Sequence, residues 1–273
     1  MMRKNWKLWL VGLIGFVLAL LWLTPFYLMI VNAFKMKREI FSDTLGLPDT
    51  WTLENFTQAF EQLDFLRTLF NSIFISVVSV VIIIIFSAMA AYALSRNKSK
   101  FSSLLFFVFV AAMLIPFQSV MIPLVAQFGQ MGMLNRTGLI IMYLGFGCSL
   151  SIFLYHGTLK GIPITLDEAA KIDGANRFQV FWYIIFPLLK PMSITVGILN
   201  VIWIWNDYLL PSLVIGGAGS ETIPLKLFFF FGQYTKQWHL ALAGLTLSII
   251  PVIIAYFFAQ RQIIKGIADG AVK

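Results

Sequence analysis

The chain has 273 residues, of which 59% are hydrophobic and only 12% are charged, and its formal net charge is +8 at pH 7. A soluble domain usually carries about 25% charged residues, so this composition indicates an integral membrane protein. The Lys and Arg residues stand in short runs beside apolar stretches. That arrangement is typical of topology signals and excludes a nucleic-acid-binding surface.

No pattern for catalysis, a cofactor or a metal site is present in the sequence. The two histidines, His156 and His239, are far apart, Cys148 is the single cysteine, and neither HExxH nor paired CxxC motifs occur. The phosphate-binding pattern GxxxxGK[ST] is also missing, so any nucleotide energy must come from another chain. We therefore expect no enzymatic activity, no catalytic residues, no cofactor and no metal.

Six apolar stretches are long enough to cross a membrane as helices. The expected spans are 8–33, 69–94, 102–128, 137–159, 191–213 and 240–260, within a single transmembrane domain covering residues 1–273. Pro116 and Pro123 interrupt the third stretch, which we expect to be one kinked span because neighbouring helices can satisfy the freed carbonyls. The sequence predicts an all-α membrane protein with six transmembrane helices.

The distribution of Lys and Arg predicts the orientation. With six spans, 13 of the 20 Lys and Arg residues lie on the side of the two termini, and 7 lie on the other side. Cytoplasmic loops carry the excess of positive charge. Both termini, the loop 95–100 and the segment 160–190 are therefore expected in the cytoplasm.

Residues 160–190, called the polar segment below, carry the most informative pattern. Thr165 and Glu168 match a T-x-x-E capping box at the start of a helix, and Gly174 is placed to end that helix in a left-handed cap. Asn176 can cap a second helix, which Pro187 ends or bends. The sequence thus predicts two short helices joined by a sharp turn.

The second of these helices is expected to be amphipathic. Apolar side chains fall at helical spacing on one face, and they are Phe178, Phe181, Trp182 and Ile185. The small side chains of Ala169 and Ala170 on the first helix would let another protein approach closely. The residues alone leave two interpretations open, a docking element for a soluble partner or a capped loop that closes over the helix bundle.

A resemblance to a known family favours the first interpretation. The stretch EAAKIDGANRFQVFWYIIFPLLKP resembles the EAA-type loop of inner-membrane subunits of ATP-binding-cassette importers. Glu168, Ala169, Ala170, Gly174 and Pro187 match the pattern, and Asp173 and Ala175 fit its DGA version. WNDYLLP at 205–211 is similar to a fifth-span signature of carbohydrate permeases, and the ending KGIADGAVK resembles the tail of the maltose-type second permease subunit.

The resemblance implies a transmembrane permease subunit of a binding-protein-dependent importer for a sugar or oligosaccharide, in the cell membrane. Its implied partners are a second permease subunit, two ATPase subunits and an extracellular solute-binding protein. Residues 166–173 would form the coupling helix, which rests in a cleft of an ATPase subunit. The implied coupling residues are Leu166, Asp167, Glu168, Ala169, Ala170, Asp173, Gly174 and Ala175, and Thr165, Asn176 and Pro187 would shape the loop. The tail near 270–273 is expected to reach the same interface.

A second candidate position is Asp207, the only acidic residue in or near the end of an expected span. It either caps or orients Asn206 and its neighbours, or forms a polar gate or solute contact, because acids within membranes are functional candidates. Packing or a lining role in the pathway remains open for Pro116, Gln118, Pro123, Gln127 and Asn200.

Other functions are less compatible with the sequence. A secondary transporter would need ionisable residues within the spans, and an intramembrane enzyme would need a Ser/His pair, an HExxH motif or an Asp pair. A structural or assembly factor would not need the long polar segment. A non-sugar solute such as a polyol phosphate remains an alternative substrate for an importer.

Overall fold

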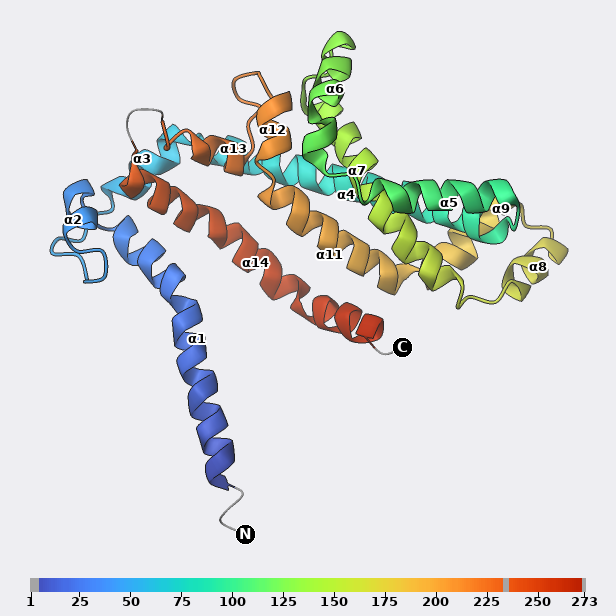
Figure 1. Cartoon of the computed structure of the whole chain (residues 1–273), viewed down its shortest axis with the longest axis horizontal. Helices are drawn as coiled ribbons and strands as arrows, with labels where there is room; N and C mark the ends of the chain where they lie inside the picture. Colours follow the sequence, from blue (N-terminus) through green and yellow to red (C-terminus); the bar gives the residue numbers. More distant parts are fainter. Residues whose placement is uncertain (1–4, 233–235, 272–273) are drawn as a thin grey trace. The chain divides into compact units, whose positions relative to one another are not determined.

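The computed structural model describes residues 5–232 and 236–271, with side chains for residues 6, 8–232, 236–257 and 260. Within these residues the chain is helical, apart from one isolated β-bridge between Phe231 and Lys236 (Figure 1). It forms two compact units, Met1–Phe65 with Lys226–Ile254 and Leu66–Leu225 with Ala255–Lys273. The two units are described separately.

The first unit contains α1 (Asn5–Ala33), α2 (Lys37–Ser42), α3 (Glu54–Gln62) and the first part of α14 (Trp238–Ala271). Polar contacts hold the end of α1 against α3. The Asn55 side chain donates to the carbonyl oxygens of Ala33 and Lys35 at 2.8 Å each, and the buried Lys35 ammonium donates to the carbonyl of Asp43 at 2.6 Å. These bonds satisfy carbonyls at the ends of α1 and α2, where no partner is available within the helices.

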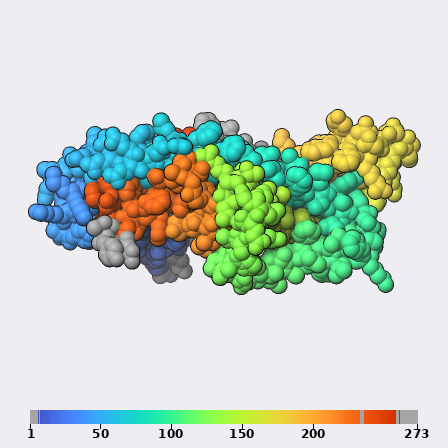
Figure 2. Space-filling view, turned by 90° about the horizontal axis from the view of Figure 1, so that it is seen from above, coloured from blue at the N-terminus to red at the C-terminus, as the bar shows by residue number. Residues whose placement is uncertain are grey.

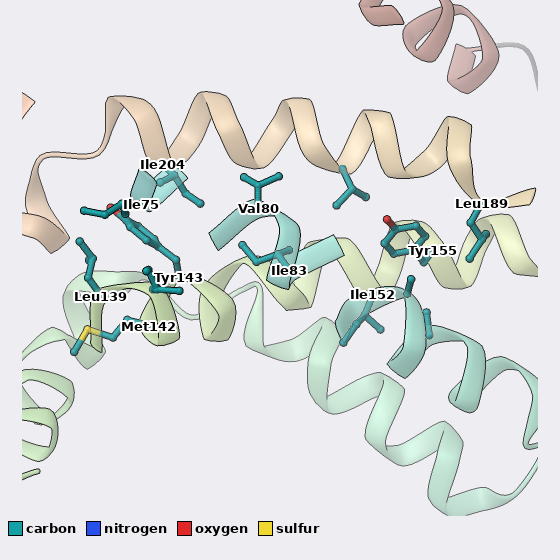
Figure 3. Close-up of a cluster of buried hydrophobic side chains, with 14 of the residues drawn as sticks. Ile75, Val80, Ile83, Leu139, Met142, Tyr143, Ile152, Tyr155, Leu189 and Ile204 are labelled. Carbon is teal, nitrogen blue, oxygen red and sulfur yellow. The ribbon is translucent and has the colours of Figure 1, made fainter. Parts of the chain in front are cut away.

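The second unit is built around α4 (Phe65–Arg96), α7 (Arg136–Leu159) and α11 (Lys190–Asn206). Buried side chains of these helices interlock in one apolar core, including Ile83 of α4, Ile152 of α7 and Ile204 of α11 (Figure 3). The remaining helices are α5 (Lys100–Ala112), α6 (Phe117–Gln130), α8 (Thr165–Ile172), α9 (Arg177–Gln179), the π-helix η2 (Val180–Ile185), α10 (Phe186–Leu188) and α12 (Leu209–Val214). Helix α13 (Ile223–Phe228) lies where the two units meet in sequence.

Three polar pairs join the antiparallel helices α7 and α11 along their length. Tyr143 donates to Asp207 at 3.0 Å, Asn200 donates to Ser151 at 3.2 Å, and the hydroxyls of Tyr155 and Ser193 are 2.8 Å apart. Between the first two pairs, Gly147 lets the helices approach, since a Cβ there would lie 2.7 Å from the Asn200 oxygen and 2.6 Å from Ile83. Small residues and hydrogen bonds of this kind are how membrane helices associate.

Among the described residues, four helices are long and apolar enough to cross a membrane unbroken: Leu8–Ala33, Phe65–Arg96, Arg136–Leu159 and Trp238–Phe257. They overlap the spans expected at 8–33, 69–94, 137–159 and 240–260. Two bent pairs bring the number to six if each pair counts as one span: Lys100–Ala112 with Phe117–Gln130, and Arg177–Leu188 with Lys190–Asn206. The chain is thus an all-α membrane protein.

The expectation of one kinked third span, 102–128, needs correction. The two helices of this pair meet at 104°, far more than a proline kink. Pro116 has an extended backbone with ψ of 139° and forms the N-cap of α6. Because proline also keeps the preceding residue out of the helical region, the chain breaks over residues 113–116 and restarts in a new direction. Pro123, by contrast, lies inside α6 without ending it.

The expected fifth span, 191–213, is also interrupted. Helix α11 ends at Asn206, and Asp207 has an extended backbone before the short α12 begins. Pro211 lies in the first turn of α12 and has no amide to bond the carbonyl of Asp207, so α11 cannot continue through this point.

Candidate functional site

The polar segment lies at the end of the second unit where α4 ends and α5 begins (Figure 1). Its surface projects beyond these helices as the yellow region of Figure 2. Helix α8 is its first element, and it covers the expected coupling residues 166–172, with Asp173 as its C-cap.

The capping box expected from Thr165 and Glu168 is wrong. The N-cap is Ile164, and Thr165 is already the first helical residue without a side-chain cap bond. The Leu166 and Asp167 amides donate instead to the carbonyls of Pro163 and Ile164, at 3.4 and 3.0 Å. Since this preceding turn already satisfies the free amides of the helix, no side-chain cap is needed.

Asp167 anchors α8 to the end of α4. Its side chain is 2% exposed, accepts a hydrogen bond from the Tyr92 hydroxyl at 2.6 Å, and lies 3.0 Å from the Arg96 guanidinium. Arg96 also donates to the carbonyl of Ile162 at 3.2 Å, just before α8. Both hydrogen bonds, from Tyr92 and from the Arg96 Nε at 3.3 Å, go to Oδ1, whereas the buried Oδ2 has only the ion-pair contact with Arg96. The negative charge is paired, so this contact fixes the position of α8.

The opposite face of α8 is exposed, and none of the residues that the structure describes covers it. Ala170 turns inward with Asp167, whereas Leu166, Glu168 and Ala169 are exposed. Ile172 is 86% exposed, which leaves a large apolar side chain uncovered at the tip. The two neighbouring alanines, Ala169 and Ala170, therefore differ, and only Ala169 offers its methyl group to a partner.

A Schellman motif ends α8. Gly174 has φ of 86°, the left-handed conformation that glycine adopts without steric cost. Its amide donates to the carbonyl of Lys171 at 3.1 Å, and the Ala175 amide donates to the carbonyl of Ala170 at 2.9 Å. These are the two bonds of the motif, so the turn is defined by the backbone.

Asn176 starts the next helix with a complete capping box. Its side chain accepts from the Gln179 amide at 3.0 Å, and the Gln179 side chain accepts from the Asn176 amide at 2.8 Å. The two helices and the intervening turn are therefore tightly specified by local bonds.

The apolar face expected on the second helix is present only in part. Phe181 and Ile185 are buried, but Phe178 and Trp182 are 66% and 38% exposed, and Val180 is buried instead. The reason is that residues 180–185 form a π-helix, whose wider turn changes which side chains share a face. Pro187 lies in the short α10, and the chain then bends by 75° into α11.

The structure does not bring the second candidate position near the polar segment. Asp207 lies at the other end of α11, about 26 Å along the helix axis from Lys190. Its Oδ1 accepts from the amides of Leu209 and Leu210 at 3.0 and 3.4 Å, so it caps α12. The neighbouring Asn206 side chain is exposed and donates to the carbonyl of Ile202 at 2.7 Å.

The sequence did not reveal the partners of these acidic residues. Sequence reasoning uses Arg96 only as a topology charge and assigns no role to Tyr92 or Tyr143. For Tyr92 and Arg96 a local signal does exist. The two residues are four positions apart on one face of α4, and the Arg96 guanidinium lies 6.0 Å from the centre of the Tyr92 ring. The expected tail contacts lie outside the part of the chain whose side chains the structure describes.

Comparisons with known proteins agree with this arrangement. Residues 83–269 match the model of the family described as binding-protein-dependent transport system inner membrane component. The "Probable starch degradation products transport system permease protein AmyC" of Thermoanaerobacterium thermosulfurigenes is 55% identical over 100% of both chains. The "Multiple sugar-binding transport system permease protein MsmG" of Streptococcus mutans serotype c is 36% identical over 93% of both chains.

A solved structure gives the same result for the fold. A chain in the crystal structure of a bacterial ABC transporter involved in the import of the acidic polysaccharide alginate superposes with a TM-score of 0.77. The two chains are 26% identical, and the match covers 96% of this chain and 98% of the other. The match over most of the sequence, together with the anchored polar segment, means that this chain belongs to the family of inner membrane components of binding-protein-dependent transport systems.

Proposed function

We propose that the chain is a permease subunit of an ABC importer for oligosaccharides, and that α8 is the helix through which a separate ATPase subunit drives it. The family assignment supports the transport function, and the names of two similar permeases support sugars as the solute class. The relative that is 55% identical is named for starch degradation products, so oligosaccharides of glucose are the first solutes to test.

One observation carries the coupling role, namely the attachment of Asp167 to α4. A helix that transmits force must move together with the spans, and a loosely attached loop would absorb the displacement. The bonds of Asp167 to Tyr92 and Arg96 join α8 directly to a 32-residue helix. On the far side, Glu168, Ala169 and Ile172 offer a surface with one charge, one small residue and one apolar residue to a partner.

The remaining residues of the segment have supporting roles in this proposal. Ala170 packs inward, while Asp173, Gly174 and Ala175 form the turn that holds α8 apart from α9. Asn176 and its capping box fix the start of the second helix, and Pro187 lies where the chain bends into α11. Leu166 adds apolar surface beside Glu168.

The family membership supports the partners in this proposal. The chain pairs with a second permease subunit, two ATPase subunits bind the cytoplasmic side, and a binding protein delivers solute from outside. This chain hydrolyses no ATP itself. Both termini and the polar segment face the cytoplasm, as the excess of Lys and Arg on that side predicts.

Cross-linking tests the coupling role. Ala169→Cys in a Cys148→Ser background, with the complex assembled in native membranes, should cross-link to the ATPase subunit in high yield. A cysteine at Ser103, an exposed position on α5, serves as the control and should not cross-link. Equal yields at both positions would contradict the assignment of α8.

A functional test uses Gly174→Asp. This variant should assemble poorly or hydrolyse ATP without solute uptake, because Gly174 is exposed beside the surface proposed to face the ATPase subunit, and an acidic side chain there adds a charge to that contact. Uptake of labelled glucose oligosaccharides in proteoliposomes, with glycerol phosphate as the competing solute, measures both coupling and substrate class. Normal uptake by the variant would refute the coupling role, and competition by glycerol phosphate alone would refute the sugar assignment.

A further inference from the structure

A groove of about 560 Å³ lies between the end of α4 and the polar segment. Its lining includes Met89, Arg96, Asp167, Lys171, Arg177 and Phe178. The volume is in the range of sites that bind small organic ligands. The coupling role uses the opposite, outward face of α8 and does not account for this groove.

The charges that face the groove are unbalanced. Arg96, Lys171 and Arg177 are cationic, and Asp167 is the single acidic residue of the lining. Asp167 is already engaged by Arg96 and Tyr92. Neither Lys171 nor Arg177 has an ion-pair partner among the residues that the structure describes, so the groove presents two uncompensated positive charges to a ligand.

The polar and apolar parts of the lining are separated along α4. Met89 and Ala93 belong to the apolar span, and Met89 lies about 10 Å along the helix from Arg96. Phe178 and Phe181 add aromatic surface from the polar segment. One end of the groove is therefore lined by apolar side chains within the span, and the other end, where the span stops, is lined by cationic side chains.

We propose that this groove binds an anionic phospholipid, with the phosphate of its headgroup against Lys171 and Arg177 and the start of an acyl chain against Met89. Basic pockets beside transmembrane helices on the cytoplasmic side suit such headgroups. The arrangement favours a lipid over an acidic side chain of the ATPase subunit, because a soluble partner has no reason to contact residues that reach into the apolar span. The lipid would sit beside the Asp167 anchor and thereby stabilise the attachment of α8.

Native mass spectrometry of the assembled complex tests this proposal with phosphatidylglycerol and phosphatidylcholine as probes. The intact complex should retain phosphatidylglycerol in preference to phosphatidylcholine. The double variant Lys171→Gln/Arg177→Gln should bind phosphatidylglycerol about 30-fold more weakly, since each cation near an anionic lipid contributes about a fivefold factor. Both side chains are exposed, so the variant should keep its fold.

The matched control is Lys98→Gln/Lys160→Gln, which removes two exposed cations on the same side of the membrane that do not line the groove. It should retain wild-type affinity for phosphatidylglycerol. An equal loss in both double variants would overturn the proposal, because the effect would then be general charge attraction. Unchanged lipid binding in the groove variant, with loss of the ATPase subunit from the complex, would overturn it in favour of a protein partner.

Discussion

Asp167 and Arg96 are 71 residues apart in sequence, yet their side chains form an ion pair of 3.0 Å. The pair joins α8 to the end of α4, and Tyr92 strengthens it from the preceding turn of α4. This contact makes the polar segment part of the helix bundle and distinguishes it from a tethered loop.

Asp167→Asn should destabilise the protein by about 3 kcal/mol, because it leaves the charge of Arg96 without its partner. Thermal unfolding of the purified complex measures the loss. The exposed Asp173→Asn serves as the stability control and should stay within about 0.5 kcal/mol of the wild type. The double variant Arg96→Gln/Asp167→Asn should lose less than the sum of the two single variants, since it leaves no unpaired charge. Strict additivity would mean that the ion pair contributes nothing.

The turn after α8 can be tested by backbone conformation alone. A Cβ at Gly174 would meet no atom within 4 Å, so a substitution acts through its φ of 86°. Gly174→Val should reduce uptake and cost about 1–2 kcal/mol, whereas Gly174→Asn should be milder because Asn tolerates the left-handed conformation. Uptake and thermal unfolding should rank the variants in the same order. A valine variant as active as the asparagine variant would contradict the argument.

Close packing of α7 predicts opposite effects for two glycines on one helix. Gly147→Ala should destabilise the protein by about 1–3 kcal/mol, because its Cβ would overlap Ile83 and the Asn200 side chain. Gly145→Ala is the matched control, since its Cβ would meet nothing within 4 Å. It should be neutral or stabilise the helix by up to about 1 kcal/mol. Equal unfolding temperatures for the two variants would show that α7 is packed less closely than described.

Local sequence patterns predicted much of the polar segment. The turn at Gly174 and the cap at Asn176 depend on residues within a few positions, so their chemistry is visible in the sequence. The cap assigned to Thr165 failed because the carbonyls of Pro163 and Ile164 satisfy the same amides, and a motif search does not weigh that competition.

Features that depend on distant residues were not predictable. The partner of Asp167 lies on another helix, and apolar composition does not report which helices touch. The bend at Pro116 was expected to be a kink, since sequence marks the position of a proline but not the angle that packing imposes. The π-helix at residues 180–185 left no signal, because a wider turn uses the same apolar residues as an ordinary one.

Substitutions at Asp207 can distinguish a capping role from a role as a gate or solute contact. Its side chain caps α12 through Oδ1 and accepts from Tyr143 through Oδ2. If capping is its role, Asp207→Asn should cost about 1 kcal/mol or less and leave the KM for solute unchanged, because Asn remains a good N-cap. Asp207→Ala should cost about 2 kcal/mol, since it removes the cap and leaves the buried Tyr143 hydroxyl without an acceptor.

Tyr143→Phe completes this comparison, because it removes the bond to Oδ2 and keeps the cap at Oδ1. It should match Asp207→Asn in unfolding temperature and in the KM for uptake. Tyr155→Phe, which removes the hydroxyl pair with Ser193 at the other end of α11, should cause a similar small loss of stability. An increase of about tenfold in the KM of Asp207→Asn, at unchanged stability, would instead assign Asp207 to the solute pathway. A capping side chain affects stability, whereas a side chain that contacts the solute affects the KM when Asp is replaced by the neutral Asn.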